Sequence, residues 1–110
     1  FLKEEVDDLS FYFKQKDFYP IVYAFRNNYE KFSYIPDKIT KQQLDFISTR
    51  NDKRKNPIKD HLFKGNVFYI TCIASKELLE GFYHDLKDYY QCLFSKDIYS
   101  QDWWLEIFYN

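Results

Sequence analysis

The 110-residue sequence is poor in glycine, proline, cysteine and methionine, with two, three, two and none of them respectively. Phosphate-cradling loops need several glycines, and no Ser or Cys is framed by glycine in the way of a catalytic nucleophile. Cys72 and Cys92 lie in no Cys-x-x-Cys pair or Cys/His cluster. We therefore expect two free thiols in an intracellular protein, with one disulfide as the alternative.

An excess of charge of one sign and a long apolar run are also missing. The chain has 16 Lys plus Arg against 17 Asp plus Glu, which points to neither a nucleic-acid nor an anionic-membrane partner. It contains no run of about 18 uncharged apolar residues that would span a membrane. No signal peptide is visible after Phe1, although processing could have removed a targeting segment. We expect a cytoplasmic protein with one domain, residues 1–110.

Aromatic residues are abundant, at 23% of the chain. A domain of this length cannot bury all of these rings, so some Tyr and Trp side chains should lie partly exposed. Such rings favour binding because they offer a large contact area at a low entropic cost. The alternative is that they lie flat on the surface, with their hydroxyl groups in water and no partner.

The spacing of apolar residues predicts helices along most of the chain. The expected helices cover residues 2–14, 18–35, 41–50, 75–94 and 98–109. Thr40 and Gln43 form a capping box before the third of them. Residues 67–74 are rich in β-branched and aromatic side chains, which suits a strand, but they continue the stripe of the helix at 75–94, so we favour a buried helix that leads into it. The predicted fold is an all-α compact bundle of five to six helices; the alternative is α+β with one hairpin near residues 58–73.

The neutral total charge hides two regions of opposite sign. Residues 38–64 contain eight basic and three acidic residues, whereas residues 75–110 contain three basic and seven acidic residues. Lys and Arg neutralise phosphates, so the basic segment 50–61 is a candidate contact for nucleic acid. Its candidate residues are Arg50, Lys53, Arg54, Lys55, Lys59 and His61.

Within this segment, Arg54 and His61 in RKNPIKDH resemble the Arg-x4–6-His signature of the HEPN ribonuclease superfamily. The resemblance implies a helical domain in which the Arg and the His act on an RNA phosphodiester. RNA binding, or a HEPN-like ribonuclease activity, is therefore the alternative function.

The sequence offers little for metal binding. His84 and Asp88 are one helical turn apart, but a metal site needs three or four such ligands, and a solvated helix face explains the same pair. We expect no metal and no cofactor.

The function that we favour from the sequence is non-catalytic binding of another protein. Acidic and aromatic residues interleave near the C-terminus, where the acids would steer a cationic partner and the rings would anchor it. The candidate residues are Tyr83, Asp85, Asp88, Tyr89, Tyr90, Asp97, Tyr99, Asp102, Trp103, Trp104 and Glu106. Immunity proteins that neutralise nuclease toxins share this profile, because they occlude a basic cleft. We therefore predict a basic protein partner, and the alternative is that the two Trp rings pack into the core.

Overall fold

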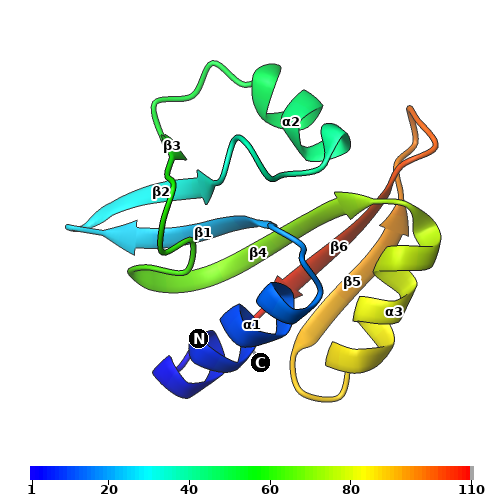
Figure 1. Cartoon of the computed structure of the whole chain (residues 1–110), viewed down its shortest axis with the longest axis horizontal. Helices are drawn as coiled ribbons and strands as arrows, with labels where there is room; N and C mark the ends of the chain where they lie inside the picture. The colour runs from blue at the N-terminus through cyan, green and yellow to red at the C-terminus, as the bar shows by residue number, and fades with distance from the viewer. Residues whose placement is uncertain (110) are drawn as a thin grey trace.

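The computed structural model describes residues 1–109 and shows an α+β fold with a six-stranded sheet in the order β3-β2-β1-β4-β6-β5 (Figure 1). The β2–β3 pair is parallel and the other neighbouring pairs are antiparallel. The elements are α1 (Lys3–Gln15), β1 (Ile21–Arg26), β2 (Tyr29–Tyr34), α2 (Lys41–Ser48), β3 (Lys55–Pro57), β4 (Asn66–Ala74), α3 (Lys76–Leu86), β5 (Gln91–Lys96) and β6 (Trp103–Phe108). The predicted all-α bundle is therefore wrong.

Two of the predicted helices form close to their expected bounds, as α1 and α2. The hydroxyl of Thr40 caps α2 by accepting a hydrogen bond from the Gln43 amide at 3.2 Å. The Gln43 side chain does not complete a capping box. It is fully buried, donates to the carbonyl of Tyr19 at 2.8 Å and accepts from the amide of Ile73 at 3.3 Å. Gln43 therefore fixes α2 to the sheet.

The predicted helix 18–35 is instead the β1–β2 hairpin. Its turn is formed by Asn27 and Asn28, which have φ values of 52° and 68°. Asparagine tolerates this left-handed region, and two such residues in sequence form the tight turn that matches the twist of a hairpin. The residues of the apolar stripe that indicated a helix divide between the two faces of the sheet, with Val22 in the core under the helices and Phe25 on the opposite face. Both faces of β1 are apolar, so periodicity alone misassigned this segment.

The helix predicted at 75–94 forms only over its first half, as α3, and the helix predicted at 98–109 is wrong. Residues 67–74 belong to β4, α3 ends at Leu86, and the rest of the predicted helix 75–94 passes through a turn into β5. The segment 98–109 contains β6. The alternative hairpin near 58–73 placed a strand correctly at β4, but β4 pairs with β1 and β6. Both partners are distant in sequence, which explains why local patterns missed the sheet.

The sheet has two unlike faces. Helices α1 and α3 lie in front of it in Figure 1 and pack their buried residues, including Leu9 and Phe82, against inward-facing strand residues such as Ile70. On the opposite face, Ile47 of α2 packs against a smaller buried cluster that contains Ile21. Helix α2 covers only one end of that face. No helix within residues 1–109 is long and apolar enough to cross a lipid bilayer.

Candidate functional site

The structure separates the two tryptophans of the predicted acidic and aromatic surface. They are neighbours on β6, so their side chains point to opposite faces of the sheet. The Trp103 ring lies 4.8 Å from that of Phe94, beneath α3, whereas the Trp104 ring lies 5.1 Å from that of Phe46 in α2. Both rings are half-buried, so neither tryptophan is a free anchor.

Other members of the predicted set lie elsewhere. Asp97, Tyr99 and Asp102 belong to the connection between β5 and β6, where the hydroxyl of Ser100 donates to the Asp97 carboxylate at 2.8 Å and keeps the pKa of Asp97 below its usual value. Tyr83 stacks on Phe94 at the helical face, and Glu106 lies on the opposite face of the sheet. The eleven residues therefore do not form one surface.

Three of them do meet in a groove between α1 and α3. The acidic groove has a volume of about 410 Å³ and contains Asp85, Tyr89 and Tyr90 together with Glu5 and Asp8 of α1. The Asp85 carboxylate accepts a 2.6 Å hydrogen bond from the hydroxyl of Tyr12, and burial together with this bond raises the pKa of Tyr12. Asp88 is exposed on the turn after α3. The contribution of α1 was missed because the two helices are far apart in sequence.

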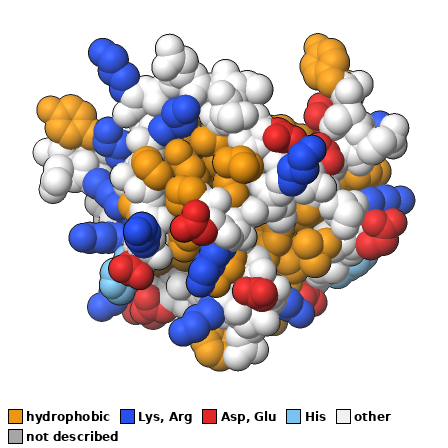
Figure 2. Space-filling model, turned by 45° about the horizontal axis from the view of Figure 1, so that its top comes forward, with side chains coloured by type: hydrophobic (Ala, Val, Ile, Leu, Met, Phe, Trp, Pro, Cys, Tyr) orange, Lys and Arg blue, Asp and Glu red, His pale blue; other side chains and the backbone are white. Residues whose placement is uncertain are grey.

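The basic residues predicted for nucleic acid run along one edge of the sheet, from the end of α2 through β3. In Figure 2 the Lys and Arg side chains gather in the left half of the view, around hydrophobic surface. Lys53 and Lys59 are exposed, and Lys55 lies beside Phe32 in the parallel β2–β3 register. The guanidinium of Arg50 lies 4.5 Å from the ring centre of Phe46.

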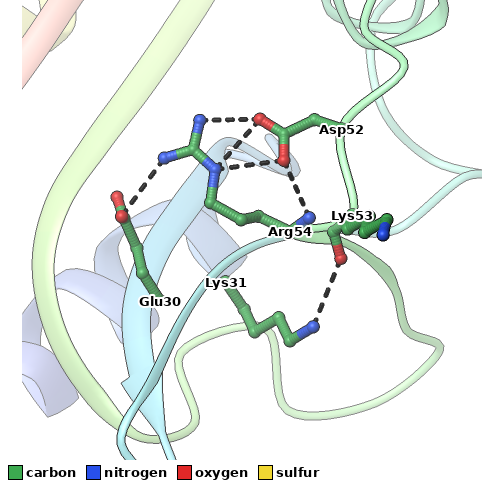
Figure 3. A network of polar contacts seen from close by, with 5 residues as sticks. All are labelled: Glu30, Lys31, Asp52, Lys53 and Arg54. Atoms are coloured by element: carbon green, nitrogen blue, oxygen red, sulfur yellow. Dashed lines mark hydrogen bonds and ion pairs between the residues drawn. The ribbon is translucent and has the colours of Figure 1, made fainter.

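Arg54, the central residue of this edge, is already neutralised within the chain (Figure 3). Its guanidinium donates to both carboxylate oxygens of Asp52, the shortest contact being 2.6 Å, and lies 3.2 Å from the Glu30 carboxylate. The hydrogen bonds from Arg54 lower the pKa of Asp52 to about 2, and they raise that of Arg54. We call Glu30, Arg50, Asp52, Lys53, Arg54 and Lys55 the β3 rim.

Arg54 and His61 flank β3 and do not lie on a helix. The α+β fold therefore differs from the helical domain that the resemblance to HEPN ribonucleases implies. His61 is exposed, with a φ of 57°. The predicted RNA cleavage would need Arg54 to leave the two carboxylates that it contacts.

Sequence reasoning missed a row of aromatic rings on the face that α2 leaves open. Phe32, Tyr23, Tyr69 and Phe108 lie opposite one another on β2, β1, β4 and β6, one from each strand. Successive ring centres are separated by 5.5, 4.8 and 5.0 Å. Phe32 is buried at one end, and the other three rings are half-buried.

A register shift widens this row. The pairing of β1 with β4 slips between Tyr23 and Ala24, so Phe68 is an extra residue in β4. Phe68 and Tyr69 then both have ring contacts with Tyr23. Phe68 also lies 4.9 Å from Phe25, whose side chain is 46% exposed. We call Tyr23, Phe25, Phe68, Tyr69 and Phe108 the ring surface.

The rings of this surface pack closely against one another, one pair stacked and the others tilted. Tyr69 and Phe108 are stacked, with an angle of 23° between ring planes whose centres are 5.0 Å apart. At that separation the rings must stand on the sheet, because rings lying flat side by side would overlap. Burial raises the pKa of both Tyr23 and Tyr69, and the Tyr69 hydroxyl donates to Glu106 at 2.7 Å. The hydroxyl groups are therefore uncharged at neutral pH.

The cysteines and the potential metal ligands also bear on the chemistry of this chain. Both cysteines are free; burial raises the pKa of Cys92 to about 11 and also raises that of Cys72, so neither is a thiolate at neutral pH. Among residues 1–109, no group of three or more His, Cys, Asp or Glu side chains could hold a metal ion. No protein-family model, curated protein or solved structure matches the chain.

Two local signals could have indicated the ring surface. The first signal is alternation: Tyr23 and Phe25 in IVYAFR, and Phe32 in YEKFSY, alternate with residues that face the other side of the sheet. The second is the Asn27-Asn28 pair between these segments, which forms a hairpin turn. The contributions of β4 and β6 had no such signal, because they depend on long-range pairing.

Proposed function

We propose that this chain is a non-catalytic protein-binding domain whose contact surface is the ring surface. The observation that carries this proposal is the set of five adjoining rings on the sheet face beyond α2. Four of these rings are half-buried and Phe25 is exposed, and contiguous apolar surface that reaches solvent often marks a binding site. Aromatic rings are also enriched among the residues that dominate protein–protein affinity.

The geometry favours a protein over RNA. Single-stranded nucleic acid is held by stacking bases on ring faces, and here Tyr69 packs between Phe108, on which it stacks, and Tyr23, which is tilted against it. Arg54 is engaged by Asp52 and Glu30. The ring edges and the exposed side of Phe25 instead suit the apolar side chains of a protein.

The charge of the β3 rim supports a proposal about the charge of the partner. It carries four basic and two acidic side chains, an excess of two positive charges beside the ring surface. Lys55 belongs to the same side of the sheet as the rings, because it lies opposite Phe32 in register. We propose a partner whose contact surface is apolar at its centre and acidic where it faces the β3 rim.

The test compares two exposed phenylalanines on opposite faces. A photo-crosslinking amino acid replaces Phe25 on the ring surface or Phe11 on α1, which are 46% and 63% exposed. After irradiation in cells, the proposal predicts a defined protein adduct at position 25 and none at position 11. The adduct is identified and purified for measurement, because capture alone does not show that the contact is specific.

Calorimetry with the purified partner then measures how each substitution changes the binding affinity. Phe25→Asp should weaken binding by about tenfold or more, because removing the most exposed ring of the surface and adding a charge costs over 1.4 kcal/mol. Phe11→Asp, the matched control, should leave affinity unchanged. Equal losses in both variants, or an adduct with RNA at position 25, would contradict the proposal.

A second candidate function rests on the acidic groove. Glu5, Asp8 and Asp85 surround exposed and half-buried tyrosine rings there, which favours the basic partner predicted from the sequence, such as a nuclease toxin in an immunity-type complex. Tyr89→Ser would weaken binding of that partner and leave the contact of the ring surface unaffected. The opposite pattern would exclude the groove.

We include a cytoplasmic location in the proposal. It is supported by two free thiols, which a reducing compartment maintains.

A further inference from the structure

A second hollow lies on the helical side of the molecule, away from the ring surface. It runs between α1 and the segment 58–65 and has a volume of about 620 Å³, within the range of small-molecule sites. Its floor is apolar and includes Phe13, Phe18, Ile35 and Leu62, all of which are buried. We call it the α1–loop groove.

The wall of this groove is held in place by defined contacts. Arg26 reaches from the end of β1, and its guanidinium donates to the carbonyl oxygens of Lys64 at 3.2 Å and His61 at 3.5 Å. The amide of Lys64 also donates to the carbonyl of His61 at 3.1 Å. Phe63 stacks against Phe13 at 6.2 Å between ring centres. The segment is therefore a built wall that does not need a ligand to form.

The polar groups along the groove are predominantly cationic or hydrogen-bond donors. Lys14 from α1 and Lys64 from the wall both line it, together with His61 and Ser10. Among residues 1–109, neither lysine forms an ion pair. Asp7 is the one acidic side chain in the lining, and it lies two helical turns before Lys14. The mouth of the groove therefore has unpaired positive charge near Lys14 and Lys64.

We propose that the α1–loop groove binds a small amphipathic anion, with an apolar body on the phenylalanine floor and a carboxylate, sulfonate or phosphate at the two lysines. The inference does not depend on the ring surface, which lies on the opposite face of the sheet. It assigns the chain a ligand site in addition to its proposed protein contact.

Two fluorescent probes with the same rings separate the roles of apolar surface and charge. Anilinonaphthalene sulfonate carries one negative charge, and N-phenylnaphthylamine is its uncharged counterpart. The proposal predicts saturable binding of one sulfonate probe per chain and weaker binding of the neutral probe. Near-ultraviolet circular dichroism confirms that each variant keeps its packed aromatic core.

Three variants locate the probe. Lys14→Glu with Lys64→Glu should weaken sulfonate binding by about tenfold, since two charge contacts are reversed at the groove mouth. The control Lys3→Glu with Lys87→Glu has the same net charge and should have no effect, because those lysines are outside the lining. Ser10→Leu fills the groove without changing charge and should weaken both probes.

Three results would overturn the proposal. The first is the absence of saturable binding. The second is equal affinity for the two probes, which would leave an apolar hollow with no preference for an anion. The third is loss of probe binding in Phe25→Asp with no loss in Ser10→Leu, which would place the probe on the ring surface.

Discussion

The two faces of the sheet use aromatic rings in different ways. On the helical face, Phe13 and Phe18 meet Phe82 edge to face, at interplanar angles of 88° and 70°, and all three are buried. On the open face, Tyr23, Tyr69 and Phe108 are inclined to their neighbours by 41° and 23°, in a row set by the strand spacing. The first arrangement closes a core, and the second leaves ring edges outside.

The comparison shows that aromatic rings can serve folding on one face of the sheet and binding on the other. Rings that interlock at right angles fill volume, so each contributes to folding stability. Rings that stand side by side keep area available to a partner at little conformational cost, because their neighbours already hold them. We therefore expect mutations of the helical face to affect folding first and mutations of the ring surface to affect binding first.

The largest predicted effect is the contrast between Phe13→Ala and Phe108→Ala. Phe13 is fully buried, and its loss should lower the free energy of unfolding by about 3–5 kcal/mol through lost burial and a residual cavity. Phe108 is half-buried, and its loss should cost about 1 kcal/mol. Urea denaturation measures both. Equal destabilisation would remove the distinction between a core face and a contact face.

The second prediction concerns the attachment of α2. Gln43→Ala leaves the carbonyl of Tyr19 and the amide of Ile73 without their partner and should cost about 2–3 kcal/mol. Hydrogen exchange of the α2 amides should also become faster. Gln42→Ala is the matched control on the same helix, with an expected change below about 0.5 kcal/mol. If the two variants exchanged alike, α2 would not be held by Gln43.

The third prediction compares two tyrosine hydroxyls. Tyr69→Phe removes the 2.7 Å hydrogen bond to Glu106 at the half-buried ring surface and should cost about 1 kcal/mol. Tyr12→Phe removes the 2.6 Å bond to Asp85, which is exposed, and should cost less. Thermal or urea denaturation of both variants checks the order. A larger loss of stability for Tyr12→Phe would contradict the conclusion that the hydroxyl of Tyr69 is the better shielded of the two.

The smallest predicted effect is at the β3 rim. The pKa of Asp52 is about 2 in the folded chain, below the ordinary value of an aspartate, so its contribution to stability is present at neutral pH and is lost as pH falls toward 2. The pair is exposed, so the change in stability should be small. A carboxyl NMR titration should show a raised Asp52 midpoint in Arg54→Gln. An unchanged midpoint would mean that Arg54 does not hold Asp52.

The sequence predicted only part of the fold, because the sheet depends on distant segments. Thr40 identified the start of α2 correctly, since capping is a local interaction. The wrong helix at 18–35 arose because apolar spacing was given more weight than the Asn27-Asn28 turn. β4 and β6 could not be paired from local patterns, because nothing in either segment specifies the other.

The ring surface was not predicted at all, and the acidic groove was predicted only in part. Asp85, Tyr89 and Tyr90 do share a groove, as neighbours in sequence often can, but their α1 partners come from the other end of the chain. Trp103 and Trp104 were assigned to one surface because a helix was assumed. On a strand, adjacent residues point to opposite faces.

Hydroxyl-radical footprinting of the domain, free and bound to the partner identified by crosslinking, tests the central claim most directly. Protein binding at the ring surface predicts lower oxidation of Tyr23, Phe25 and Phe108 in the complex, with Phe11 and Tyr89 unchanged. Protection of Phe11 or Tyr89, with Phe25 still oxidised at its free rate, would contradict the account.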